Sequence, residues 1–233
     1  MAVRLVRSIS DSPVLNGLLE EHLLTERPLG DVLLFYINRP SVIVGRNQRI
    51  EAEVDTDYCL RHGIEIVRRL SGGGTVYHDF GTVNFTHIVP AGHHIDMKQL
   101  CFPLAEVLRQ WVPRLEISGN DLVIDGRKIG GTAQRQFPGR RLFHGCLLYR
   151  TDLVRLAELL TPSAEKLQRH GVASVRARVA NLSEFYETAP PVEQFLADLR
   201  LACGTLLRVQ AAEIPSELWE QAEAKRESEA SYV

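Results

Sequence analysis

Three consecutive glycines, Gly72 to Gly74, interrupt the segment VRRLSGGGTVYHDFGTVNFTHI at residues 67–88. Glycine loses more conformational freedom on folding than any other residue, so a triplet inside ordered structure needs a physical purpose. Consecutive glycines let backbone N–H groups point into one concavity, where no side chain blocks an approaching anion. The triplet therefore predicts either a phosphate-binding loop or a purely structural turn or bulge.

The residues around the triplet differ from both common phosphate motifs. A P-loop requires Lys-Ser or Lys-Thr after its glycines, and GGGTVYHD has neither. A dinucleotide fingerprint requires a helix directly after the glycines, but TVYHD is typical of a strand. Arg68 and Arg69 precede the loop, and GRKIGGTAQRQ places Lys128 beside a second pair of glycines. Two such cationic sites favour binding of a nucleotide-activated acyl group over a structural turn.

The pattern of apolar residues predicts a mixture of helices and short strands. Ser12 and Pro13 are typical of a helix start, followed by an apolar face. Two hairpins are predicted, one joining strands at 32–37 and 41–45 through NRP, the other turning at Asp125-Gly126. Further strands are expected at IEIVRR, 82–89 and 141–150, and further helices at DTDYCLRHG, MKQLCFPLAEVLRQWV, DLVRLAELL, PVEQFLADLRLACGTLL and PSELWEQAEAKRESE. Central hairpins between helices predict an α+β domain around a largely antiparallel sheet.

Charge and composition exclude several classes of protein. With 27 basic and 29 acidic residues, the net charge of −2 argues against broad electrostatic binding to nucleic acid or an anionic membrane. No apolar run approaches a membrane span, and no export signal is present. The four cysteines form no C-x-x-C pair, so we expect reduced thiols in a cytoplasmic protein. His93 and His94 are weak metal candidates, and no metal ligand is assigned.

Two segments, RRLSGGGTVYHDFGTVNFT and NDLVIDGRKIGGTAQRQ, resemble the lipoate–protein ligase A family. Further similarity lies in DSPVLNGLLEEHLL, SVIVGRNQ, LFHGCLLY and GVASVRARVANLSEF (171–185). Residues 1–233 are accordingly expected to form a single catalytic domain without a C-terminal accessory domain. The resemblance implies an α+β fold with a largely antiparallel or mixed sheet flanked by helices, as in biotin and lipoate protein ligases and class II aminoacyl-tRNA synthetases.

The resemblance also implies an enzyme that uses ATP and Mg²⁺ to convert lipoate to lipoyl-AMP. The lipoyl group would pass to a lysine of the lipoyl domain of 2-oxoacid dehydrogenase E2 or of glycine-cleavage H protein. By motif position, the residues that would hold ATP or the adenylate are Arg69, Gly72, Gly73, Gly74, Thr75, Val76, Tyr77 and Lys128. Lys128 would also contact the lipoate carboxylate, with His78 beside the lipoate.

The chemistry of such a reaction is consistent with these residue types. A carboxylate that attacks an α-phosphorus brings two anions together, and a lysine with loop N–H groups offsets that repulsion. In the second step the attacking lysine must be neutral. Residues that could assist its deprotonation, or serve structure alone, are His78, Asp79 and His144. Residues predicted to line a tunnel for the acyl chain are Val44, Val76, Phe85 and Leu147.

Three alternatives remain open at this point. Octanoyl- and lipoyl-transferases of the same fold use a cysteine thioester without ATP, and Cys146 lies 18 positions beyond Lys128. However, EISGNDLVIDGR contains no cysteine, its Asn120 and Asp121 match the ligase pattern, and we expect Cys146 to be a small buried apolar residue. The chain could also be a non-catalytic lipoate- or adenylate-binding subunit. Finally, a ligase of this kind could depend on a separate accessory-domain protein.

Overall fold

The computed structural model describes residues 3–26, 28–91, 97–160 and 179–228, with the backbone alone for 97–103. The strands are β1 (Arg4–Arg7), β2 (Val32–Tyr36), β3 (Ser41–Val44), β4 (Glu65–Arg68), β5 (Val76–His78), β6 (Thr82–Pro90), β7 (Leu115–Ser118), β8 (Asp121–Ile124), β9 (Arg127–Phe137), β10 (Arg140–Leu148) and β11 (Gln210–Ala211). The helices are α1 (Pro13–Thr25), α2 (Ile50–Glu53), α3 (Thr56–Arg61), α4 (Met97–Trp111), α5 (Leu153–Leu159), the 3₁₀ helix η1 (Leu182–Phe185), α8 (Val192–Leu207) and α9 (Ser216–Ser228).

Two sheets organise these elements. The large sheet has the strand order β11-β1-β2-β6-β10-β9-β8-β7, and the small one has the order β4-β3-β5. In the large sheet, β1 runs parallel to β11 and β2, whereas the pairs from β2 through β6, β10, β9, β8 and β7 are antiparallel. The predicted α+β class with a mixed, largely antiparallel sheet is therefore confirmed.

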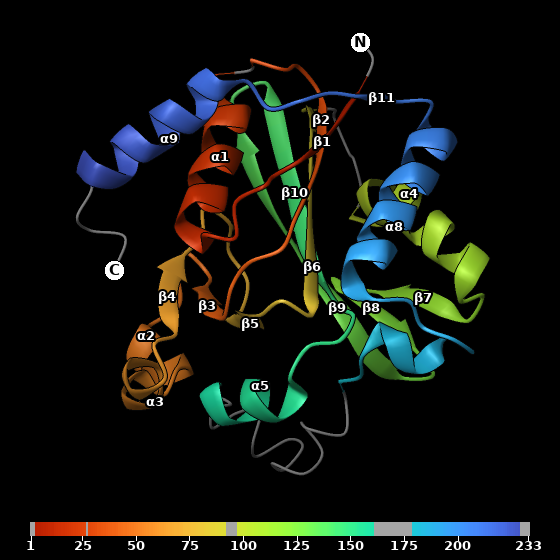
Figure 1. Ribbon diagram of the computed structural model, residues 1–233, viewed down its shortest axis with the longest axis horizontal. Coiled ribbons are helices and arrows are strands. Elements are labelled where there is room, and N and C mark those ends of the chain that lie inside the picture. Colours follow the sequence, from red (N-terminus) through yellow and green to blue (C-terminus); the bar gives the residue numbers. More distant parts are fainter. Residues whose placement is uncertain (1–2, 27, 92–96, 161–178, 229–233) are drawn as a thin grey trace.

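Helices cover both faces of the large sheet. Helices α1 and α9 lie together on one face, and α4 and α8 lie on the other (Figure 1). The small sheet, with α2, α3 and α5 near it, extends beyond the end of α1 (Figure 1). Among the described residues, no helix is long and apolar enough to cross a membrane.

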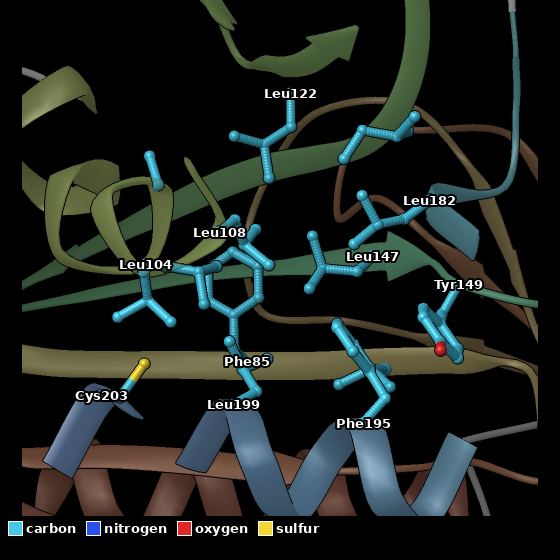
Figure 2. Close-up of a cluster of buried hydrophobic side chains, with 14 of the residues drawn as sticks. Phe85, Leu104, Leu108, Leu122, Leu147, Tyr149, Leu182, Phe195, Leu199 and Cys203 are labelled. Carbon is cyan, nitrogen blue, oxygen red and sulfur yellow. The ribbon is translucent and has the colours of Figure 1, made fainter. Parts of the chain in front are cut away.

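The larger hydrophobic core lies between the sheet and the α4–α8 layer. Figure 2 shows Phe85 from β6 and Leu147 from β10 among side chains of that layer. Tyr149 stacks on Phe195 with ring centroids 3.9 Å apart, and its hydroxyl donates to the carbonyl of Pro190 at 2.7 Å. Each large apolar side chain buried here stabilises the fold by about 1.5–3 kcal/mol. This core makes the sheet a rigid support for residues on its opposite face.

The first helix begins as the sequence predicts. The Ser12 hydroxyl accepts a hydrogen bond from the amide of Leu15 at 3.4 Å, and Pro13 occupies the first turn. Leu15 and Leu18 pack with Ala222 of α9, whereas Leu19 and Leu23 are buried against strand residues such as Leu34. The same face also buries the polar Asn16 and Glu20, which apolar periodicity does not predict.

One predicted hairpin is confirmed and one is wrong. Asp125 and Gly126 both have positive φ, 51° and 75°, and join β8 to β9. The strands around NRP, β2 and β3, do not pair with each other. Both edges of β2 are taken by β1 and β6, while β3 lies between β4 and β5 in the other sheet. The predictions for His93, His94 and residues 171–178 lie outside the described residues.

Candidate active site

A cavity of about 310 Å³ opens between α1, the glycine segment and the α1-facing side of the large sheet. Its walls come from α1, the small sheet, and strands β2, β6, β8, β9 and β10. Of the predicted ATP-binding residues, those in the wall are Arg69, Gly73, Gly74, Thr75, Val76 and Lys128. Predicted positions separated by more than fifty residues in sequence thus meet at one site.

Arg69 shapes the glycine loop through hydrogen bonds to its backbone. Its guanidinium donates to the carbonyls of Gly72 at 2.8 Å and Gly74 at 2.7 Å. It also donates to the carbonyl of Ile43 at 3.1 Å and to the Ser71 hydroxyl at 2.9 Å. Burial lowers the pKa of Arg69, and the negative groups around it partly offset this effect. Arg69 therefore fixes the carbonyls of Gly72 and Gly74 so that they point toward its guanidinium.

The loop amides remain available for a ligand. Within the described part of the chain, the N–H groups of Gly72, Gly73 and Gly74 donate no backbone hydrogen bond. Gly73 adopts φ +91°, which favours glycine. A Cβ at Gly45 would lie 2.0 Å from the Gly73 carbonyl oxygen, so the two backbones are in direct contact. Exposed loop amides beside a cavity form a suitable anion cradle.

The residues after the loop divide between the two sides of β5. Thr75 lines the cavity, and its buried hydroxyl has no hydrogen-bond partner among the residues that the structure describes. Val76 also lines the cavity, whereas the Tyr77 ring is fully buried on the other side, against Val42 and Val44. The Tyr77 side chain consequently does not reach the cavity, because successive residues of a strand face opposite ways.

Lys128 reaches the cavity from β9. Its Nζ lies 2.8 Å from Oδ1 of Asp121, and both side chains are about two-fifths exposed. A Cβ at Gly131 would lie 3.1 Å from the same Nζ, so this glycine makes room for the ammonium group. The carbonyl of Lys128 accepts from the amide of Ala180 at 2.9 Å, which fixes the strand at this position.

His78 is held in one tautomer by a chain of amides. The carbonyl of Ser10 accepts from Asn16 Nδ2 at 3.0 Å, and Asn16 Nδ2 also donates to Asn38 Oδ1 at 2.8 Å. Asn38 Nδ2 must then donate to His78 Nδ1 at 3.1 Å, which leaves the proton on Nε2. Burial, with Arg69 and His144 nearby, lowers the pKa of His78 to about 3. His78 is thus a neutral hydrogen-bond donor at the cavity wall.

His144 belongs to a second buried network. Its Nδ1 lies 3.0 Å from Oε2 of Glu20, and its Nε2 lies 2.6 Å from the Ser71 hydroxyl. The Glu20 carboxylate also accepts hydrogen bonds from Tyr36 and Thr86. Burial by itself would raise the pKa of Glu20, but His144 and these donors hold it below its ordinary value. The network connects Glu20 and His144 in the cavity wall to Ser71, the residue directly before the glycine loop.

Other predicted residues have structural contacts. The Asp79 carboxylate accepts from the amides of Gly81 and Asp152, each at 2.8 Å, and so fixes the turn after β5. The residues predicted for the acyl tunnel separate: Val44, Phe85 and Leu147 lie in hydrophobic cores, so their prediction is wrong for this cavity. Val76 lines the cavity, and its contact with an acyl chain stays a prediction. Phe85 and Leu147 lie on the face of the large sheet opposite α1, and Val44 of the small sheet packs with Cys59 and Leu159.

Cys146 lines the cavity from β10 and is 6% exposed. Burial raises the pKa of its thiol, although Lys128 partly offsets the effect. Since the thiolate is the nucleophilic form, this environment disfavours nucleophilic attack.

Comparison with known sequences agrees with this geometry. The sequence model of the lipoyl protein ligase A/B catalytic domain matches residues 12–203, more than half of the chain. The chain belongs to this family. Lipoate-protein ligase LplJ of Bacillus subtilis is 39% identical over 197 residues, covering 83% of this chain and 59% of the relative. Lipoate–protein ligase 1 of Staphylococcus aureus is 35% identical over 215 residues, covering 91% of this chain and 66% of the relative.

Solved structures of lipoate–protein ligases share the fold. A bipartite lipoate protein ligase from Thermoplasma acidophilum superposes with a TM-score of 0.80 at 27% identity, covering 100% of this chain and 94% of that one. A lipoate-protein ligase A bound with ATP superposes with a TM-score of 0.78 at 25% identity, covering 100% of this chain and 96% of that one. The curated relatives are longer, so the chain spans less than two thirds of their length.

Sequence reasoning missed several polar residues of this family member's cavity. The cavity wall includes Glu20 of α1, Asn38 after β2 and Asn84 of β6. Asn16 of α1 and Ser71 before the glycines support this wall through hydrogen bonds to Asn38 and His144. Asn16 and Glu20 carried a readable signal, because each interrupts an apolar helix face. Asn84 carried a similar signal, because it is an amide on the same strand face as Thr86 and Ile88, opposite the face that carries Val83.

Proposed function

We propose that this chain activates lipoate with ATP to lipoyl-AMP and transfers the lipoyl group to a lysine of a lipoyl domain. The observation that carries the proposal is the meeting of three features in one cavity. These are the loop amides, which donate no backbone hydrogen bond within the described residues, the ammonium of Lys128, and the apolar lining at Ile43, Val67 and Val76. An anionic nucleotide and an acid with an apolar chain both fit such a site.

In the first step, a carboxylate oxygen of lipoate attacks the α-phosphorus of ATP and pyrophosphate leaves. Lys128 is placed to contact both anions, which reduces their repulsion and stabilises the charge that develops. The loop amides at Gly73 and Gly74 hold the phosphates. Because Arg69 fixes the loop before any ligand binds, little reorganisation accompanies the reaction.

In the second step, the neutral amine of the acceptor lysine attacks the acyl carbon and AMP leaves. His78, with its proton on Nε2, is placed to donate a hydrogen bond to the bound acyl compound. In the described structure neither His78 nor His144 offers an unengaged Nδ1, because Asn38 and Glu20 occupy those atoms. We therefore assign both histidines to positioning.

Mg²⁺ would accompany the nucleotide. The described residues contain no cluster of three or more His, Cys, Asp or Glu side chains that could hold a metal on its own. Mg²⁺ typically needs only one or two carboxylates together with phosphates. Asp121, at the cavity wall beside Lys128, fits this role, and the ion would supply charge neutralisation at the phosphates.

Acceptor and accessory proteins form the finer part of the proposal. The Thermoplasma acidophilum neighbour is a bipartite ligase described with its E2 lipoyl domain. We infer a lipoyl domain of E2 or glycine-cleavage H protein as the acceptor here, in the cytoplasm. A separate accessory protein that assists the activation step is compatible with the same cavity.

The test is lipoate-dependent exchange of labelled pyrophosphate into ATP, with transfer from supplied lipoyl-AMP to a lipoyl domain measured in parallel. The ligase proposal predicts both activities, and Lys128→Ala should abolish exchange. Transfer without exchange would indicate that activation requires an accessory protein. Transfer only from an octanoyl carrier protein, with an acyl group trapped on Cys146, would instead establish the transferase alternative.

A further inference from the structure

The side-chain amide of Asn84 lies in the cavity wall without a partner. Asn84 belongs to β6 and is 1% exposed, yet neither its Nδ2 nor its Oδ1 makes a hydrogen bond within the described structure. A buried amide that lacks partners is destabilising. Water that fills the cavity can serve this amide, so a ligand that displaces the water must compensate for the loss. Such a residue is a strong candidate for ligand contact.

The register of the strands places this amide relative to Lys128. Tyr36, Asn84, Cys146 and Gly131 are directly paired neighbours across β2, β6, β10 and β9. The Lys128 Nζ lies over Gly131, 3.1 Å from the position of a Cβ there. With strands about 4.8 Å apart, Asn84 lies roughly 10 Å across the sheet from that ammonium.

This separation matches the length of the acid in the proposed reaction. A saturated chain advances about 1.2 Å per bond, so an eight-carbon acid spans roughly 8 Å from its carboxylate. If the carboxylate contacts Lys128, the far end of the chain lies beside Asn84 and Tyr36. In lipoate this end carries a five-membered disulfide ring, whereas in octanoate it is a plain hydrocarbon.

We propose that the Asn84 amide recognises the far end of the bound acyl chain by donating a hydrogen bond to a ring sulfur, and so favours the dithiolane acid over the saturated acid. The inference rests on the proposed function and extends it to substrate selectivity. Sulfur is a weak acceptor, but it compensates the buried N–H in a way that methylene groups cannot. Octanoate leaves both polar atoms of the amide without a partner.

The experiment measures equilibrium binding of lipoate and octanoate, each alone, by calorimetry. Asn84→Leu replaces the amide with an apolar group of similar size. Asn84→Ala removes the amide with a smaller side chain, so an effect seen in both variants does not come from the bulk of leucine. Val83→Ala is the matched control, because Val83 lies on the same strand but points into the opposite core. Circular dichroism and thermal melting confirm that each variant is folded, and ATP affinity is measured in each.

Asn84→Leu and Asn84→Ala should each shift the lipoate-to-octanoate affinity ratio toward octanoate by roughly tenfold, since the weak bond to sulfur is lost and the unpaired amide is removed. Val83→Ala should leave the ratio unchanged. An unchanged ratio in both Asn84 variants would overturn the inference, as would a loss of ATP affinity in place of acid selectivity. Failure of the unmodified protein to bind either acid would instead contradict the proposed function.

Discussion

Replacement of His78 by glutamine should make the stability of the protein less sensitive to acid. Burial and the nearby charges of Arg69 and His144 lower the pKa of His78 to about 3, whereas an unfolded histidine titrates near 6.5. Between these values the unfolded chain binds a proton that the folded chain does not. The folded state therefore loses stability as the pH falls below about 6.5.

The size of the effect follows from the two pKa values. From about pH 7.5 to about pH 5, the unfolded histidine gains nearly a full proton, which lowers the free energy of unfolding by about 2 kcal/mol. Glutamine removes this contribution, while its side-chain oxygen can still accept from Asn38. Urea unfolding at both pH values gives the difference directly.

The comparison is between variants, so contributions from other titrating groups cancel. The unmodified protein should lose about 2 kcal/mol more than His78→Gln over this pH interval. His62→Gln, which removes an exposed histidine just after the short helix α3, controls for loss of a histidine as such. Equal pH sensitivity of His78→Gln and the unmodified protein would refute the assignment of a buried, neutral His78.

Three further substitutions test the cavity. Lys128→Ala should abolish lipoate-dependent pyrophosphate exchange while leaving the melting temperature within a few degrees, because the side chain is partly exposed; an active variant would contradict its role. Gly45→Ala should weaken ATP binding at least tenfold by calorimetry, since its Cβ would meet the Gly73 carbonyl at 2.0 Å and displace the loop. Unchanged ATP affinity there would argue against the loop as a phosphate cradle. Cys146→Ser should retain most exchange activity, and loss of turnover would favour a thioester mechanism.

The sequence predicted the outer parts of the site better than its interior. The glycine loop and the Asp125-Gly126 hairpin were readable because local backbone geometry demands glycine there. The hairpin placed Lys128 on its strand, and pairing of β9 with β10 then brought that strand to the cavity. Local sequence signals were sufficient for these features.

The interior required the tertiary structure. NRP looks like a hairpin turn locally, but each flanking strand finds its partners in a different sheet. Glu20 and His144 are 124 positions apart, and no local pattern indicates that they meet. The acyl tunnel was misplaced at Phe85 because strand alternation identifies two faces without telling which one borders the ligand.

The most direct test of the central claim is detection of lipoyl-AMP itself. The purified chain is incubated with ATP, Mg²⁺ and lipoate without an acceptor, quenched, and the adenylate is measured by mass spectrometry. A cavity that joins the glycine loop to Lys128 predicts lipoyl-AMP in amounts comparable to the enzyme, and none with Lys128→Ala. Equal amounts of adenylate from both proteins, or none from the unmodified protein despite binding of ATP and lipoate, would contradict the claim that this cavity performs the activation step.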